Sequence, residues 1–428
     1  MTIALPQIES VVDRGLCCGC GACAGLAPDS YRMVDHEEDG LRPQRRPGSP
    51  AAPEDVRRAC PGIALQHETP PDEHMTREWG PVRAVFEGHA IDPDTRHIGS
   101  SGGVITALAD HGLRSGSAAG VLHVRARTDA PWLNETTLST TSSELRRGAG
   151  SRYAPASPIE GLPLLEDVDG PCVVVGKPCD IAALHQACRS RPALRDRIAV
   201  TIALFCAGTP STRGTIEMLR AMGIDDHTII TSLRYRGHGW PGEATASLPA
   251  STGPTTRALS YEKAWGEILT RHKQWRCRIC PDHTGELADI AVGDPWDRPP
   301  TGEEPGRSLV VARTARGAAW IDAARTSGIV ALDAVDADRI ETAQPALRVA
   351  RGQVWGRLLA LRVLRQPTPT FRGFPMFRAW WSALTWRQKA QSLIGTIRRV
   401  RRGRHRPELN PDHDIVGRIE PSSHRVAA

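Results

Sequence analysis

The stretch PCVVVGKPCDIAALHQAC, residues 171–188, contains the pattern that decides the fold of this chain. An apolar run of small and branched residues is followed by a turn and then by a helical pattern. The stretch RIAVTIALFCAGTPS, residues 197–211, again places a continuous apolar run before a turn of small residues. Continuous apolar runs between helices are typical of parallel strands that are covered on both faces. The two stretches therefore predict a mainly parallel α/β sheet.

The same logic extends to both sides of this region. Upstream, PVRAVFEGHA (81–90) and GVLHVRAR (120–127) are expected strands, and GSSGGVITALADHGLRSG (99–116) is a glycine-rich turn that leads into a helix. Downstream, ADIAVGDPWDRP (288–299) is another expected strand, ending in Gly293, Asp294 and Trp296. Open α/β sheets bind their ligands at the carboxyl ends of such strands, so the residues that follow them are the candidates for function.

Composition limits the class of protein. The chain has 428 residues, of which 40% are hydrophobic and 24% charged, and this suits a soluble globular protein of two or three domains. The net charge of +6 is modest. Eleven cysteines without a paired framework, and an N-terminus that lacks the features of a signal peptide, predict a cytoplasmic chain in a reducing compartment. No apolar run is long enough to span a bilayer.

The stretch LCCGCGACAG, residues 16–25, predicts a metal centre. Cys17, Cys20 and Cys23 form a C-x2-C-x2-C run, a spacing that allows thiolates on one loop to hold an iron–sulfur cluster. Bacterial ferredoxins place a Cys-Pro pair shortly after such a run, but here that position is Ala27-Pro28. Cys60, which precedes a proline, can supply the missing thiolate. We therefore expect one 4Fe–4S cluster held by Cys17, Cys20, Cys23 and Cys60, with Cys18 as a spare thiol.

These thiols have two alternative uses. Four thiolates also suit zinc, although the short spacings and the Cys-Pro pair favour iron–sulfur chemistry. A disulfide is not expected, because the thiols crowd one loop and no signal peptide is present.

Four further cysteines form a second candidate group. Cys179 and Cys206 follow two of the predicted parallel strands, and WRCRICPD adds Cys277 and Cys280 as a C-x2-C pair. Spacing alone leaves two interpretations open: a second cluster, or single cysteines that act as small hydrophobic core residues. Cys172 and Cys188 are expected to be core or surface residues.

The turn SSGGV is a candidate anion site. It comprises Ser100, Ser101, Gly102, Gly103 and Val104 at the start of an expected helix, where backbone N–H groups can bind a phosphate. The alternative is an ordinary helix start with a serine as the N-cap residue. The turn is neither G-x-G-x-x-G nor a P-loop, so it indicates neither an NAD nor an ATP site.

Together these motifs resemble the family of coenzyme F420 hydrogenase/dehydrogenase beta subunits, from about residue 16 to about residue 300. The resemblance rests on CCGCGAC, CPG, SSGGVITAL, GSRYAPAS, GKPCDIAAL, LFCAGTPS, RYRGHGWPG and CRICPDHTGELADIAVGD, which occur in the family's order. It implies FAD, an N-terminal ferredoxin-like cluster and, as in several members, a second 4Fe–4S cluster. A looser likeness links GRLLALRVLRQPTPTFRGFPMF (356–377) to relatives encoded beside polysaccharide genes.

The resemblance also assigns roles to residues. It implies that Cys179, Cys206, Cys277 and Cys280 hold the second cluster, and that SSGGV lies against the flavin phosphates with Tyr153 and Lys177 nearby. We place Lys177, Arg234 and Arg236 as candidates to contact the anionic tail of a deazaflavin substrate. No acid–base residue is assigned. Candidates are named only from their place in motif loops: Asp289, Asp294 and His238.

The function implied is an FAD- and 4Fe–4S-dependent oxidoreductase that exchanges electrons with coenzyme F420, a deazaflavin. A flavin suits this role because it handles both single electrons and hydride. The alternatives are a ferredoxin-fed reductase of a cell-envelope polysaccharide or pigment metabolite, an electron-transfer subunit without its own substrate, and a cluster-bearing protein without turnover.

The predicted organisation has four parts. A ferredoxin-like 4Fe–4S segment (1–70) precedes an N-terminal flavin-binding part (71–155), a catalytic α/β domain with the second Fe–S site (156–345) and a basic helical C-terminal region (346–428). Within the last part, FRAWWSALTWRQKAQSLIGTIRRVRRGRHRP (377–407) combines three tryptophans with many arginines. One interpretation is a helix that binds an anionic membrane or a partner protein. The other is a solvated helix whose tryptophans pack on the core. Nucleic acid is not an expected partner, because no reading motif accompanies the charge.

Overall fold

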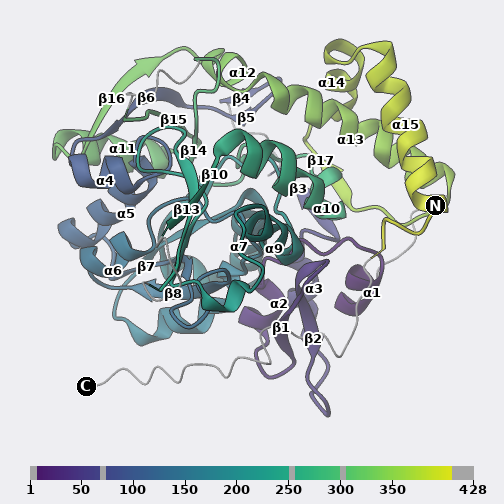
Figure 1. The fold of residues 1–428 in the computed structure, drawn as a ribbon, viewed down its shortest axis with the longest axis horizontal. Helices are drawn as coiled ribbons and strands as arrows, with labels where there is room; N and C mark the ends of the chain where they lie inside the picture. The colour runs from purple at the N-terminus through teal and green to yellow at the C-terminus, as the bar shows by residue number, and fades with distance from the viewer. Residues whose placement is uncertain (1–6, 68–73, 250–255, 299–304, 407–428) are drawn as a thin grey trace.

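The computed structural model describes residues 7–67, 74–249, 256–298 and 305–406. Its centre is one sheet of eight strands between helices (Figure 1). In spatial order, the strands are β16 (Val330–Val335), β6 (Ala84–Ala90), β15 (Ser308–Ala312), β14 (Ile290–Gly293), β10 (Ile198–Leu204), β9 (Cys172–Gly176), β7 (Gly120–Ala126) and β8 (Asn134–Ser139).

The directions of the strands bear out the expected α/β sheet. Strands β14, β10, β9 and β7 are neighbours and run parallel. β6 runs in the same direction, but β15 separates it from them by two antiparallel pairings. The outer strands β16 and β8 are also antiparallel to their neighbours. The sheet is therefore mixed, with a parallel centre that contains all the motif strands from residue 120 to residue 293.

Alternating side chains build a core on each face. On β9, Val173 belongs to the core that contains Leu108 and Ile321, and Val174 belongs to the opposite core with Ile181. The first face is covered by α5 (Val104–Ser115) and α11 (Ala315–Thr326), and the second by α7 (Pro178–Ser190). Burial on both faces explains why these strands are continuous apolar runs.

The N-terminal segment packs on the α7 side of the sheet. It contains α1 (Ile8–Asp13), α2 (Ala22–Leu26), the hairpin β1 (Tyr31–His36) and β2 (Gly40–Arg45), α3 (Glu54–Arg58) and β3 (Ala64–Gln66). Cys20 and Ala24 share one core with Val174 and Leu184. β3 pairs in parallel with β17 (Thr370–Arg372), so this segment also contacts the C-terminal region. The expected segment boundary near residue 70 lies outside the described residues.

A smaller unit covers one end of the sheet. Its strands β11 (Ser232–Arg234), β12 (Glu243–Ser247) and β13 (Thr256–Ser260) form an antiparallel sheet. They share a core with α9 (Thr212–Ala221) and the π-helix η4 (Glu262–Ile268). The remaining short elements are β4 (Met75–Thr76), β5 (Gly80–Pro81), α4 (Pro93–Ile98), α6 (Ser142–Arg147), η1 (Pro158–Asp167), α8 (Pro192–Asp196), η2 (His227–Ile229), η5 (Leu269–His272), α10 (Trp275–Arg278) and α12 (Arg339–Ala343).

The C-terminal region is a group of three helices beside the sheet (Figure 1). They are α13 (Pro345–Val363), α14 (Met376–Ala383) and α15 (Trp386–Arg401). The sequence suggested one helix from residue 377, but the chain forms two. The reason is local: Thr385 and Gln388 form a capping box, which starts a new helix at Trp386. Residues 407–428 of the predicted C-terminal part lie outside the described residues.

Candidate cofactor site

A cavity of about 300 Å³ lies at the carboxyl ends of the parallel strands. Gly176, Leu204 and Gly293, the last residues of β9, β10 and β14, all line it. The turn before α5 and the small antiparallel unit contribute further walls. This is the edge at which an open α/β sheet is expected to hold a ligand.

The SSGGV turn forms one wall of the cavity. Ser100, Ser101, Gly103 and Val104 line the space, whereas Gly102 packs against the backbone of β6 and β15. The N-cap residue of α5 is Gly103, with a φ of 71°, and no side chain caps the helix. The serine-capped alternative is therefore wrong. First-turn N–H groups without a side-chain cap, facing a cavity, are suited to bind an anion.

Both serine hydroxyls of this turn hold the loop together. Ser101 donates to the carbonyl of Arg307, and its oxygen accepts from Ser308 at 3.1 Å. The Ser100 hydroxyl accepts the N–H of Ser151, which follows the GSRYAPAS motif's first residue. The serines thus join the turn to two distant segments, and the backbone is left to face the cavity.

Lys177 lies where β9 ends and α7 begins. Its ammonium group donates to the carbonyl of Ala156 at 2.9 Å and to the carboxylate of Asp180 at 2.7 Å. Burial lowers the pKa of Lys177, but the adjacent carboxylate outweighs burial, so the pKa is raised and the lysine stays charged. Burial raises the pKa of Asp180 to about 6, against the opposing effect of the lysine. Lys177 and Asp180 therefore form a buried ion pair in the cavity wall.

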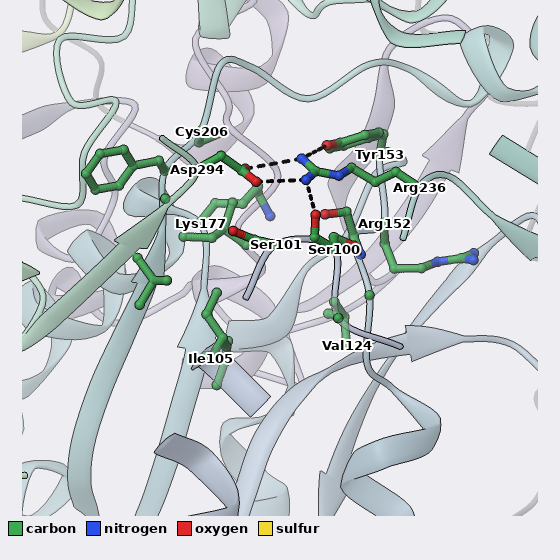
Figure 2. Close-up of a pocket in the computed structure, with 18 of the residues that line it drawn as sticks. Ser100, Ser101, Ile105, Val124, Arg152, Tyr153, Lys177, Cys206, Arg236 and Asp294 are labelled. Atoms are coloured by element: carbon green, nitrogen blue, oxygen red, sulfur yellow. Dashed lines mark hydrogen bonds and ion pairs between the residues drawn. The ribbon is translucent and has the colours of Figure 1, made fainter. Parts of the chain in front are cut away.

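Arg236 and Asp294 also line the cavity, and Figure 2 shows their charged groups facing each other. The guanidinium of Arg236 contacts both carboxylate oxygens of Asp294, at 2.7 and 3.1 Å, and donates to the carbonyl of Ser100. It also donates to the hydroxyl of Tyr153 at 3.3 Å. Arg236 is only 1% exposed, and its pKa is raised because Asp294 outweighs the effect of burial. This arginine joins three motifs of the sequence, so its contacts favour a role in building the cavity.

Aromatic rings complete this part of the cavity wall, and the sequence had singled out neither Tyr261 nor Trp265. The guanidinium of Arg236 lies 5.3 Å from the ring centre of Tyr261 and 5.2 Å from that of Trp296, and these two rings are stacked. Trp265 packs on Tyr153 with ring centres 4.5 Å apart. Tyr261 and Trp265 lie at a π-helix far from the strand motifs, and no local pattern connected them to the site.

Two of the three acid–base candidates lie elsewhere. Asp289 is buried and accepts from Thr201 and Arg316, so it joins β10 to α11. His238 has a φ of 58° and contacts Arg234 at 2.9 Å, but it does not line the cavity. Asp294 lines the cavity, but its carboxylate is paired with Arg236.

The first cysteine group lies together, on the α7 side of the sheet. Cys17, Cys18, Cys20, Cys23 and Cys60 line one narrow apolar cavity. Burial raises the pKa of the Cys60 thiol to about 12, and burial also raises that of Cys23. Buried thiols in contact are suited to iron, because the metal takes the place of their protons. The structure thus brings together all four residues predicted for the first cluster.

Three residues of the second group, Cys206, Cys277 and Cys280, lie where the loop after β10 meets α10 and the loop that follows it. The fourth, Cys179, lies in the first turn of α7, beside Cys18 of the first group. Thr209 donates its N–H to the Cys277 sulfur at 3.3 Å, and Cys206 donates its N–H to the carbonyl of His283 at 2.9 Å. Burial raises the pKa values of Cys206 and Cys280 to about 12 each, with Cys277 as a neighbour of both. Gly208, with a φ of 118°, allows the close approach, since an added Cβ would lie 3.2 Å from Cys277.

Cys18 and Arg276 connect the two cysteine groups. Cys179 and Cys20 lie beside the thiol of Cys18 and hold its pKa well below the usual range. Arg276 is 2% exposed and precedes Cys277 of the second group in the sequence. Its guanidinium donates to the carbonyl of Pro61 at 3.0 Å, and Pro61 follows Cys60 of the first group. Its charge acts on Cys18, Cys179, Cys277 and Cys280 alike. The two groups are thus adjacent, with a buried cation between them, and spacing alone did not reveal this.

A mononuclear metal site finds no support in the part of the chain that the structure describes. There, no three His, Cys, Asp or Glu side chains lie close enough together to hold one metal ion. A cubane differs, since each of its four thiolates binds a different iron and the sulfurs therefore stand further apart.

The chain matches a known protein family over two segments. The family of the coenzyme F420 hydrogenase/dehydrogenase beta subunit is described by two models, one for its N-terminal part and one for its C-terminal part. The N-terminal model matches residues 85–162, and the C-terminal model matches residues 171–338. These matches cover more than half of the chain. The chain belongs to this family. The predicted assignment is thereby confirmed, and with it the prediction of an oxidoreductase of this type.

Individual relatives are distant. An uncharacterized protein of Methanocaldococcus jannaschii is 25% identical over 78% of this chain and 93% of its own length. The coenzyme F420 hydrogenase subunit beta of Methanococcus voltae is 23% identical over 60% of this chain and 86% of its own length. A chain of the F420-reducing nickel–iron hydrogenase complex from Methanosarcina barkeri has the same fold, with a TM-score of 0.51 and 19% identity, over 67% of this chain and 94% of that one.

Among the residues that the structure describes in this family member, no helix is long and apolar enough to cross a membrane.

Proposed function

We propose that this chain is an FAD- and 4Fe–4S-dependent oxidoreductase that moves electrons between iron–sulfur clusters, a flavin and coenzyme F420. One observation carries the proposal: Cys206 belongs to the second cysteine group and also lines the cavity. The first cysteine group, the second group and the cavity therefore follow one another without a break. Such a continuous series is the arrangement that electron transfer between clusters and a flavin requires.

The cavity supplies what the dinucleotide needs. The uncapped N–H groups at the start of α5 would hold a phosphate, and the charge of Lys177 lies on the wall of the same cavity. Arg236 and Tyr153 would fix the wall beside the ring system. When bound, FAD supplies the ability to exchange hydride with an organic substrate and single electrons with clusters.

The cysteines would hold the two clusters in separate groups. Cys17, Cys20, Cys23 and Cys60 would bind the first, and the second group, Cys179, Cys206, Cys277 and Cys280, would bind the other. The buried, charged Arg276 would stabilise the added negative charge of a reduced cluster on either side.

The family and the hydrogenase relatives support a deazaflavin as the substrate. The aromatic rings of Tyr261 and Trp296 are suited to a planar ligand at the cavity wall. The anionic tail of the coenzyme would lie over Arg234, which is not buried behind the wall as Arg236 is. A redox protein such as ferredoxin or another subunit would exchange electrons with the cysteine end, in a reducing cytoplasmic compartment.

The alternative is a ferredoxin-fed reductase of an envelope or pigment metabolite, or an electron-transfer subunit without its own substrate. The looser likeness of residues 356–377 favours the first of these. It would use the same cysteine groups and the same cavity, with a different organic molecule at the aromatic wall.

The test uses anaerobically purified protein with its iron and flavin contents measured. Reduced coenzyme F420, NADH and NADPH are mixed separately with oxidised protein, and bleaching of the flavin absorbance is followed. We expect fast bleaching with reduced F420 only, because the SSGGV turn is not an NAD fingerprint. Bleaching by NADH or NADPH without bleaching by F420 contradicts the proposed substrate. If none of the three donors bleaches the flavin, the ferredoxin-fed alternative is favoured. If the purified protein contains no flavin, both the proposed function and this alternative are contradicted.

A further inference from the structure

The helices α14 and α15 lie at one end of the molecule, away from the central sheet (Figure 1). Their inner sides pack closely on α13, where Gly352 lies against Ala379 and Leu384. Lys389, which is 7% exposed, lies beneath an aromatic corner: its ammonium group is 5.0 Å from the ring centre of Trp381 and 4.6 Å from that of Trp386. The inner side of the pair is therefore packed on α13, and the outer side faces solvent.

The outer side is strongly apolar at the corner between the two helices. Trp386 is 77% exposed, Trp381 62%, Phe377 53% and Ile394 48%. These are four of the seven large hydrophobic side chains that are exposed in the described residues. An exposed apolar patch of this kind marks a surface that contacts something other than water. We call the outer side of α14 and α15, with these four residues and the arginines below, the aromatic–basic face.

The charge of this face has one sign. Residues 376–406 contain eight arginines and one lysine, with no aspartate or glutamate. Arg378 is paired with Glu78 at 2.6 Å, but Arg387, Arg398, Arg401 and Arg402 are exposed without an ion pair to any described residue. Along α15, Trp386, Ala390 and Ile394 are exposed at every fourth position and are followed by Arg398 and Arg402 in the same series.

We propose that the aromatic–basic face rests on an anionic lipid surface. Tryptophan prefers the boundary between headgroups and hydrocarbon, because its ring is apolar and its N–H is polar. Arginines beside it would meet the negative headgroups. A second copy of this chain is not the occupant, because two such faces would bring like charges together. The contact would be peripheral and reversible, and it is independent of the redox function proposed above.

The test measures sedimentation of the full-length protein with vesicles of phosphatidylcholine, with or without about 30% phosphatidylglycerol. We expect binding to the anionic vesicles only, and weaker binding when the salt is raised from about 0.1 M to about 0.5 M. Trp381→Ala/Trp386→Ala should weaken binding at least about tenfold, and Arg398→Gln/Arg402→Gln about 10- to 30-fold.

Matched controls separate this face from general surface properties. Ile91→Ala removes an exposed apolar side chain elsewhere, and Arg189→Gln/Arg220→Gln removes two exposed charges elsewhere. Both should bind as the unchanged protein does, and circular dichroism checks that every variant is folded. Absence of binding to anionic vesicles at low salt overturns the proposal and favours a protein partner. Equal binding by all variants also overturns it.

Discussion

Burial raises thiol pKa values in both cysteine groups, but the members of the two groups are distributed differently along the sequence. Three thiols of the first group lie within seven residues of one loop, and the fourth precedes a proline in the same N-terminal segment. The second group comes from the first turn of α7, from the loop after β10 and from α10 with the loop that follows it, and its members span about a hundred residues of the chain. A local motif therefore defines the first group, and the topology of a parallel sheet defines the second. Variants that affect one group and spare the other test this difference.

The largest expected effect is the loss of a whole cluster. Anaerobically purified protein should contain about eight irons per chain, four for each cubane. Cys20→Ala and Cys206→Ala should each lower this to about four by removing different clusters, as seen in the electron paramagnetic resonance spectra of the reduced proteins. Cys188→Ala, near the end of α7, is the matched control and should keep all eight. Zinc in place of iron, or about four irons in the unchanged protein, would contradict the assignment of one 4Fe–4S cluster to each cysteine group.

The next effect concerns the buried cation between the groups. Arg276→Gln should lower the midpoint potentials of both clusters, because the positive charge stabilises the more negative, reduced state. We expect about 1 kcal/mol, or roughly 40 mV for one electron. Arg278→Gln is the control, since Arg278 flanks Cys277 on its other side and its charge acts on that cysteine alone. Redox titrations measure the midpoint potentials of both variants. Equal shifts in Arg276→Gln and Arg278→Gln would show that Arg276 does not act on both clusters from a position between them.

A smaller effect should appear in the pH dependence of the free energy of unfolding, through Glu160 on η1, the element that holds the loop of the first cysteine group. Burial raises the pKa of Glu160 to about 7 from a usual value of 4.5, and η1, which carries Glu160, holds the Cys20 loop through the N–H of Ile159. The folded state thus binds the proton more tightly than the unfolded state does. The carboxyl group therefore costs stability increasingly as pH rises from about 4.5 to about 7.

Glu160→Gln should consequently raise the free energy of unfolding by about 1–2 kcal/mol at pH 8 and change it little at pH 4. Chemical denaturation of the metal-free protein at both pH values measures the difference. Glu166→Gln, an exposed position on the same element, should change stability little at either pH. A gain that is the same at pH 4 and pH 8 would contradict the assigned cause.

The smallest expected effect belongs to Cys18, the spare thiol of the motif. Cys18→Ala should leave the iron content of the first cluster unchanged, because the other four cysteines of that cavity are the predicted ligands. The contact between Cys18 and Cys179 sharpens this test. Loss of the second cluster in Cys18→Ala would make Cys18 a ligand of that group, and loss of the first cluster would show that the ligand register is wrong.

Much of the architecture could be predicted from local patterns. The apolar run ending at Gly176, the helix after Lys177 and the run ending at Leu204 are recognisable because their residues are neighbours in sequence. The same holds for the first cysteine group. The split between α14 and α15 was missed, although the capping box formed by Thr385 and Gln388 is a local signal.

By itself, the sequence determined the elements of the parallel centre, the first cysteine group and the family. These depend on spacing, on periodicity and on short-range capping, which act between neighbouring residues. The tertiary structure alone decided the antiparallel outer strands, the pairing of β3 with β17, the position of Arg276 between the cysteine groups and the rings of Tyr261 and Trp265 around the cavity. Such contacts join residues far apart in the chain, and burial selects them only when the whole core is formed.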